Sequence, residues 1–318
     1  MIGDNMEEIS RNVNWPYSQG TGSPASSNSD FPPSMSRSDK ARDILSAFSE
    51  TTLPEEFRPD LVETIGQPRT PEECVVQGDF EATMFRLAAH DENVYMGLRR
   101  AMPAGARAAI FFDKVQRRCN ALLADFDRYC QTGAPRPDGT VPEIDVVVAE
   151  LVKNVGLIQK NIQIRSPHGT KGATEVLVEL LRNIVGRNYD AFEGNTWGRV
   201  APPGETSEDR NLFAQLICDV SDDEFFVLDA LEVLPDETLS QWARPLDAVF
   251  DELQENGAPI PYLRKLHLIV GERGSETRGG SGTPPDNTTT SVATTGSSGH
   301  GHKRPATASK TSESKRLK

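Results

Sequence analysis

Residues 144–162 read IDVVVAELVKNVGLIQKNI and carry the clearest helical pattern in the chain. Their apolar side chains recur alternately four and three residues apart, at Ile144, Val148, Leu151, Val155, Ile158 and Ile162. On an α-helix this spacing draws one apolar stripe down one side. A short polar turn, RSPHGTKG, follows, and a second amphipathic segment begins at Ala173. Two such helices must bury their stripes, so we predict a helical hairpin at the centre of an all-α domain.

Helical patterns continue on both sides of this hairpin. Upstream, the sequence predicts a helix over 79–101 and another over 105–131, the latter with apolar residues at 3.6-residue periodicity. Downstream, we expect helical pairs over 207–234 and 236–270, with a kink or break at Arg244 because Pro245 lies inside the pattern. Strand signals are scarce. The prediction is an irregular multi-helix bundle or a short stack of helical hairpins, and no repeating consensus decides between them.

The two ends of the chain differ from this body in composition. Residues 1–69 are predicted to be a mostly disordered arm, because residues 1–40 are rich in Ser, Asn, Pro and Gly. The domain is expected to span residues 70–272. Its first helix should start at Thr70, which supplies an N-cap and is followed by Pro71 and two glutamates. Residues 273–318 are predicted to be a disordered tail.

Charge is distributed unevenly along the 318 residues, whose net charge is −13. From residue 271 onward there are eight Lys or Arg residues against four acids, so that segment carries +4 and residues 1–270 carry −17. An acidic body disfavours non-specific attraction to nucleic acid or anionic lipid. The N-terminus lacks the apolar core of a secretory signal, and no apolar run reaches membrane-spanning length, so we expect no membrane partner.

Signs of catalytic or metal chemistry are sparse. None of the four cysteines lies in a CxxC pair, which indicates reduced thiols of an intracellular protein rather than a zinc site. The chain has no GxSxG, HExxH or GxxxxGK[ST] pattern, and we expect no cofactor and no catalytic site. An acidic run could hold Mg²⁺, as in an all-α enzyme of terpenoid-synthase type, but the same residues suit a helix N-terminus, and we favour capping. That run is Asp219, Asp222, Asp223, Glu224 and Asp229.

One predicted helix, 105–131, carries a basic stripe. Arg107, Lys114 and Arg118 fall on one line, with Arg117 beside them, and such a stripe can contact phosphates. Aspartates on the same helix dilute the stripe. We therefore favour a solvated, salt-bridged face over a nucleic-acid interface.

The C-terminal segment, residues 303–318, reads KRPATASKTSESKRLK. Ten residues separate the pair Lys303–Arg304 from a second cluster of Lys315, Arg316 and Lys318. The segment resembles a bipartite nuclear localisation signal of the nucleoplasmin type, including its KRPA opening. The resemblance implies a nuclear protein whose two basic clusters bind two acidic, tryptophan-lined pockets on importin-α. It covers only these 16 residues, and the helical body resembles no family that we recognise.

Three functions follow as hypotheses. The leading one is a nuclear adaptor or regulatory protein that acts through protein–protein contacts, with transcription or chromatin as the expected process and nuclear proteins as its partners. The alternative is a nucleic-acid-binding regulator that uses helix 105–131 and the tail. The second alternative is an Mg²⁺-dependent all-α enzyme.

Overall fold

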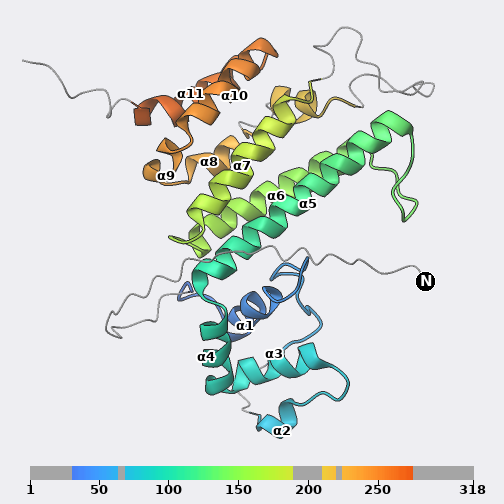
Figure 1. Cartoon of the computed structure of the whole chain (residues 1–318), viewed down its shortest axis with the longest axis vertical. Coiled ribbons are helices and arrows are strands. Elements are labelled where there is room, and N and C mark those ends of the chain that lie inside the picture. The colour runs from blue at the N-terminus through green and yellow to red at the C-terminus, as the bar shows by residue number, and fades with distance from the viewer. Residues whose placement is uncertain (1–30, 64–68, 189–209, 220–223, 275–318) are drawn as a thin grey trace, which may run out of the picture. The chain divides into compact units, whose positions relative to one another are not determined.

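A computed structural model describes residues 31–63, 69–188, 210–219 and 224–274 of the chain. Within these ranges every regular element is helical, which confirms the predicted all-α class (Figure 1). No helix in this part of the chain is both long and apolar enough to cross a membrane. The elements are α1 (Arg37–Ser46), α2 (Pro71–Cys74), α3 (Phe80–His90), α4 (Glu92–Ala101), α5 (Ala104–Thr132), α6 (Ile144–Ile164), α7 (Thr170–Val185), the π-helical turn η2 (Ala214–Cys218), α8 (Leu228–Glu232), α9 (Asp236–Ser240), α10 (Ala243–Glu255) and α11 (Ile260–Gly274).

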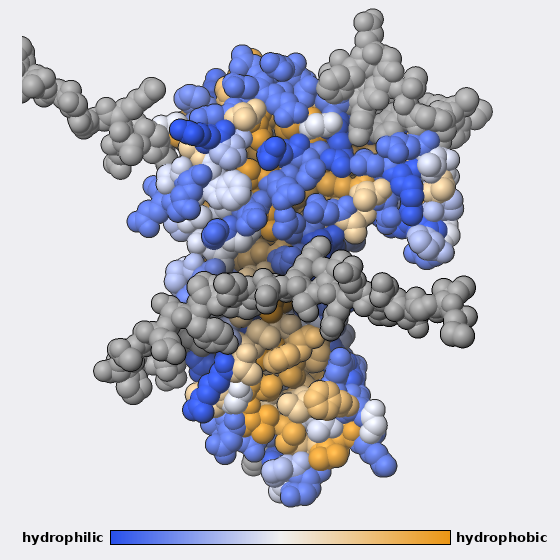
Figure 2. Space-filling view, viewed as in Figure 1, coloured by the Kyte–Doolittle hydropathy of each residue, from blue (hydrophilic) through white to orange (hydrophobic). Residues whose placement is uncertain are grey.

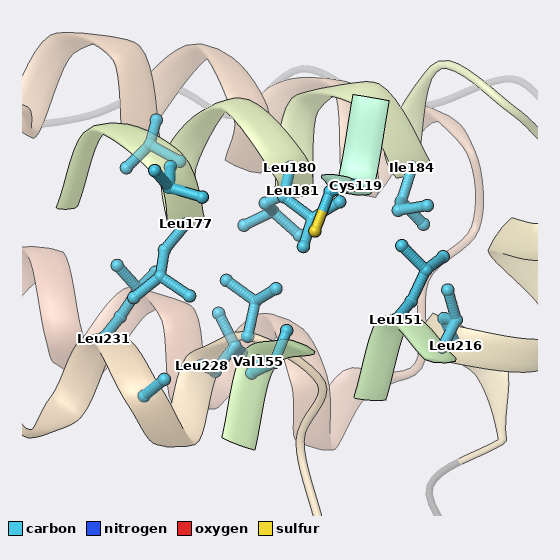
Figure 3. Packing of buried hydrophobic residues seen from close by; sticks show 14 of the residues in the cluster. Cys119, Leu151, Val155, Leu177, Leu180, Leu181, Ile184, Leu216, Leu228 and Leu231 are labelled. Carbon is cyan, nitrogen blue, oxygen red and sulfur yellow. The ribbon is translucent and has the colours of Figure 1, made fainter. Parts of the chain in front are cut away.

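The predicted hairpin is present as α6 and α7, and it lies at the centre of the main hydrophobic core (Figure 3). Leu151 of α6 and Leu181 of α7 are fully buried, and both belong to one cluster with residues of α5 and α8. One position of the predicted stripe differs, because Val147 is fully buried and Val148 is only half-buried. The 3.6-residue period shifts the buried line by one residue at that turn.

Two predicted helix boundaries need correction. The single helix expected over 79–101 is divided into α3 and α4 at Asp91, whose carboxylate accepts hydrogen bonds from the backbone N–H groups of Asn93 and Val94. The break expected at Arg244 occurs earlier, between α9 and α10, which places Pro245 in the first turn of α10. Proline is tolerated in a first turn because its missing N–H would have no helical partner there.

Residues 31–63, which precede the predicted domain start at residue 70, pack into the body. Ser36 caps α1 by accepting a hydrogen bond from Asp39 N. Ile44 and Leu53 are fully buried, and Leu53 belongs to the main core. The capping box predicted at Thr70 is confirmed, although the helix that it starts, α2, is only four residues long.

Two smaller hydrophobic clusters hold α1, α3 and α4 together. One contains Leu45 and Phe85, and the other contains Ile44 and Tyr95. Figure 2 shows apolar side chains gathered on one face of this N-terminal part. Phe48, Val62, Val75 and Phe80 are among its large apolar residues that remain exposed.

Candidate functional site

The basic stripe of α5 does not form one exposed surface, because Arg107 and Lys114 are buried. The Lys114 ammonium donates hydrogen bonds to the backbone oxygens of Ser46, at 2.7 Å, and Thr52, at 2.9 Å. Ser46 is the last residue of α1, where carbonyl groups lack helical partners and a positive charge is stabilising. Burial lowers the pKa of Lys114. Lys114 therefore anchors the end of α1 to α5.

The other two residues of the stripe form ion pairs nearer the surface. Arg118 donates one hydrogen bond to each carboxylate oxygen of Glu56, both at 2.8 Å. These bonds lower the pKa of Glu56 and raise that of Arg118. Arg117 is the most exposed of the four and pairs with Asp113 at 2.5 Å. The stripe thus attaches residues 43–56 to α5, and the predicted salt-bridged face becomes largely an internal one.

A buried ionic cluster joins α1 to α5 and to the end of α6. Asp43 lies between two guanidinium groups: its Oδ2 is 2.9 Å from Arg107 Nε, and its Oδ1 accepts a hydrogen bond from Arg165 Nη2. At least 94% of each of the three side chains is removed from solvent. The guanidinium groups also stack on aromatic rings, Arg107 on Phe31 and Arg165 on Phe111, each at 4.3 Å from the ring centroid. The sequence did not indicate this cluster, because Asp43 and Arg165 are 122 positions apart and lie in different predicted segments.

A cavity of about 80 Å³ opens beside this cluster. Exposed residues 166–168 of the α6–α7 turn lie on its lining, as does Ala104, the first residue of α5. Gly169 follows in this turn, and a Cβ atom there would come within 2.8 Å of the Phe112 ring. The turn therefore requires glycine at this position to lie close to α5. The lining residues are Phe31, Asp43, Ala104, Arg107, Ile164, Arg165, Ser166, Pro167 and His168.

A larger cavity, of about 500 Å³, lies between α7 and the start and middle of α10. Its lining combines three carboxylates, one guanidinium, one amide, one aliphatic side chain and one indole. These residues are Glu175, Val178, Glu179, Arg182, Asn183, Trp242 and Glu252. Glu179 is held by Gln116 of α5, whose Nε2 donates to it at 2.5 Å. The lining therefore carries a net charge of −2 at neutral pH around an exposed part of an aromatic ring.

A third cavity, of about 410 Å³, lies between α8 and α11, and its lining combines apolar residues with the charged groups of Glu232, Arg264 and Lys265. Phe225, Leu268 and Ile269 line it, together with Lys265. The Lys265 ammonium forms ion pairs with Asp229, at 2.5 Å, and Glu232, at 3.0 Å. Its charge is therefore already balanced within the fold.

The candidate metal run is only partly within the described residues, since Asp222 and Asp223 lie outside them. Asp229 accepts hydrogen bonds from Lys265 Nζ and from the backbone N–H of Phe225, at 2.8 Å. Over the described ranges, no three His, Cys, Asp or Glu side chains are grouped as metal ligands. The four cysteines are free thiols, and burial raises the pKa of Cys119 to about 12.

The five importin-binding candidates, Lys303, Arg304, Lys315, Arg316 and Lys318, lie outside the described residues. The nuclear localisation signal therefore remains a prediction from the sequence. No family model matches this chain, and neither a curated protein nor a solved structure matches it significantly.

Proposed function

We propose that this protein is a nuclear adaptor that binds partner proteins through its helical body, with transcription or chromatin as the process served. The observation that supports this proposal best is the acidic cavity between α7 and α10. Its chemistry suits a lysine- or arginine-rich segment of a partner protein. The basic tail supports the nuclear compartment through its resemblance to a bipartite localisation signal.

The lining of the cavity supplies both kinds of contact that a basic side chain needs. The aliphatic stem of a lysine or arginine packs on the half-buried indole of Trp242, and its charged end meets Glu175 and Glu252. Neither of these two glutamates forms an ion pair within the described part of the chain. The charge of −17 on residues 1–270 adds long-range attraction for such a segment.

A peptide titration of the full-length chain tests this site. The probe is a fluorescent 12-residue peptide of alternating Lys and Ala, and the matched probe has Glu in place of Lys. We expect the basic peptide to bind, and Glu175→Gln combined with Glu252→Gln to weaken it at least ten-fold at constant ionic strength. Glu255→Gln, an exposed change on α10 outside the cavity lining, is the control and should bind as the parent does. Equal affinity in the parent and the double variant would exclude this cavity as the docking site.

The chain's own tail is a competitor that this titration must distinguish. A peptide of residues 299–318 is added in a second series. If it displaces the Lys peptide only at much higher concentration, the cavity selects an external partner. If it binds more tightly than any other basic peptide, the cavity serves the tail and the adaptor proposal loses its main support.

The nuclear part of the proposal has a separate test. A fluorescent fusion of the full chain is compared with one in which Lys303, Arg304, Lys315 and Arg316 are changed to Ala. We expect the variant to leave the nucleus and to lose binding to purified importin-α. A variant that stays as nuclear as its parent would refute the compartment argument.

Direct nucleic-acid binding is the second candidate function, and Arg117 and the basic tail are the residues that would contact phosphates. It predicts binding of labelled DNA or RNA by the full chain, with an affinity that falls steeply as salt is raised. Absence of binding at low salt would exclude it. No observation in the described residues favours the enzyme hypothesis.

A further inference from the structure

The cavity beside Asp43 is more positive than its acidic surroundings. Two buried guanidinium groups, of Arg107 and Arg165, face it with one carboxylate, that of Asp43. Asp43 already engages both groups, since one of its oxygens pairs with each arginine. Among the described lining residues, two guanidinium groups therefore stand against one carboxylate.

Arg165 retains an N–H donor that can bind a ligand. Its Nε donates to Asn161 Oδ1, at 3.1 Å, and its Nη2 donates to Asp43. Its Nη1 has no protein acceptor among the residues that the structure describes. A guanidinium presents its N–H groups in a planar fork, which matches the oxygens of phosphate better than a single ammonium does.

The start of a long helix adds to the positive potential. Ala104 lines the cavity and is the first residue of α5, a helix of 29 residues. The residue before it is Pro103, so no side chain caps the N–H groups of the first turn. The N-terminal end of a helix carries a partial positive charge and free N–H donors, which favour an anion.

The size and the opening of the cavity define the class of ligand. About 80 Å³ is room for several waters, because one water needs only about 10–15 Å³ of such space. This space suits a tetrahedral ion but not a nucleoside or a peptide side chain with its backbone. Ser166 and His168 are exposed in the turn that borders the cavity, so their hydroxyl and imidazole groups are available at its mouth.

We infer that this cavity binds a tetrahedral oxyanion of the phosphate class. Arg165 Nη1 and the first N–H groups of α5 hold its oxygens from inside, and Ser166 and His168 hold them at the mouth. The ion ties the α6–α7 turn to α5. The source of the group is either free phosphate or the phosphoryl end of a phosphate monoester, and both present the same oxygens.

Calorimetric titration of the full-length protein with inorganic phosphate tests the inference. Ser166→Ala combined with His168→Ala removes the two exposed donors without altering the buried ion pairs. We expect phosphate to bind the parent and raise its Tm, and the double variant to bind at least ten-fold more weakly with an unchanged Tm in phosphate-free buffer. His267→Ala, at an exposed position on α11 outside the cavity lining, is the matched control and should bind as the parent does.

Three further measurements remove the remaining alternatives. Sodium chloride at the same ionic strength reports screening alone, and an equal rise in Tm with chloride would overturn the inference, as would parent-like binding by the double variant. Arg165→Lys keeps the positive charge but loses the planar fork, so a folded variant should also bind phosphate more weakly. If Arg165→Lys does not fold, the mouth variant alone decides. Phenyl phosphate distinguishes the sources: binding as tight as phosphate indicates a monoester, and much weaker binding indicates the free ion.

Discussion

Replacing Asp43 by Asn should strongly destabilise this protein, because Asp43 is a buried carboxylate between two buried arginines. The change keeps the shape of the side chain but removes the negative charge between Arg107 and Arg165. Both arginines then remain buried without their common counter-charge, because only 2% and 6% of their side chains reach solvent. Removing one partner of a buried ion pair costs about 3–5 kcal/mol. Since Asp43 serves two arginines at once, we expect the upper half of this range.

This loss is large compared with the free energy of unfolding of a typical domain, about 5–15 kcal/mol. Urea unfolding of the full chain, followed by circular dichroism at 222 nm, measures it. With a slope of about 3 kcal/mol per molar urea, the midpoint should fall by about 1–2 M. The slope itself should stay constant, because the change alters no large surface.

The control for this prediction is Asp113→Asn. Asp113 also pairs with an arginine, but both side chains are more than half exposed, so the pair contributes little. A midpoint for Asp43→Asn that matches the midpoint for Asp113→Asn would refute the reasoning. It would mean that water or a neighbouring group compensates the two arginines as well as the carboxylate does. If the cavity binds phosphate, adding phosphate should restore part of the lost stability.

Three other predictions concern the Lys114 hydrogen bonds, two helix-associated glycines and the buried thiol of Cys119. Lys114→Met should lower the free energy of unfolding by about 2–4 kcal/mol in a urea titration, because the backbone oxygens of Ser46 and Thr52 lose the hydrogen bonds that the ammonium donates. Arg117→Met is the control, and an equal effect there would contradict the assignment. Gly169→Ala should lower the free energy of unfolding by about 1–3 kcal/mol, because its Cβ would lie 2.8 Å from the Phe112 ring. Gly156→Ala, on the open face of α6, should raise the free energy of unfolding by about 0.5–1 kcal/mol. Thermal unfolding of both variants shows whether the first is less stable and the second more stable than the parent. Cys119, with its pKa raised to about 12, should resist a thiol reagent at pH 8 until the chain unfolds. Mass spectrometry measures the labelling of this residue over time, and labelling before the chain unfolds would contradict the prediction.

The central part of the fold was predictable because its information is local. The alternating spacing of Leu151, Val155 and Ile158 places all three on one face of a helix. Because the turn before Ala173 is short, the next helix must pack antiparallel to the first. The long helix α5 was likewise expected over 105–131 and spans Ala104–Thr132. In these segments the apolar period, the loop length and the helix propensity agree.

The N-terminal boundary was not predictable for the opposite reason. Residues 31–63 contain several prolines and follow a stretch rich in Ser, Asn, Pro and Gly, so composition indicated an arm. Their burial depends on partners that are distant in sequence. The ammonium of Lys114 binds the end of α1, and Leu53 packs in the main core.

For the candidate sites too, the sequence indicated local patterns but not which residues come together in space. The basic stripe of α5 was visible as a pattern, but the pattern does not tell whether a positive charge faces water or a carboxylate. The acidic cavity draws Glu175 from α7 and Trp242 and Glu252 from the α9–α10 region. The cavity beside Asp43 combines that residue of α1 with Ala104 of α5 and with Arg165, which directly follows α6. No spacing in the sequence relates these residues.

By itself, the sequence determined the helical class, the central hairpin, the capping box at Thr70 and the uneven charge of body and tail. These features follow from the helical period, from the hydrogen-bonding needs of a helix end and from composition, all of which act over a few residues. Only the tertiary structure decided which charges are buried, where the body begins and where cavities form. Those outcomes depend on which helix faces cover one another, because burial strengthens an ion pair and removes it from solvent at the same time.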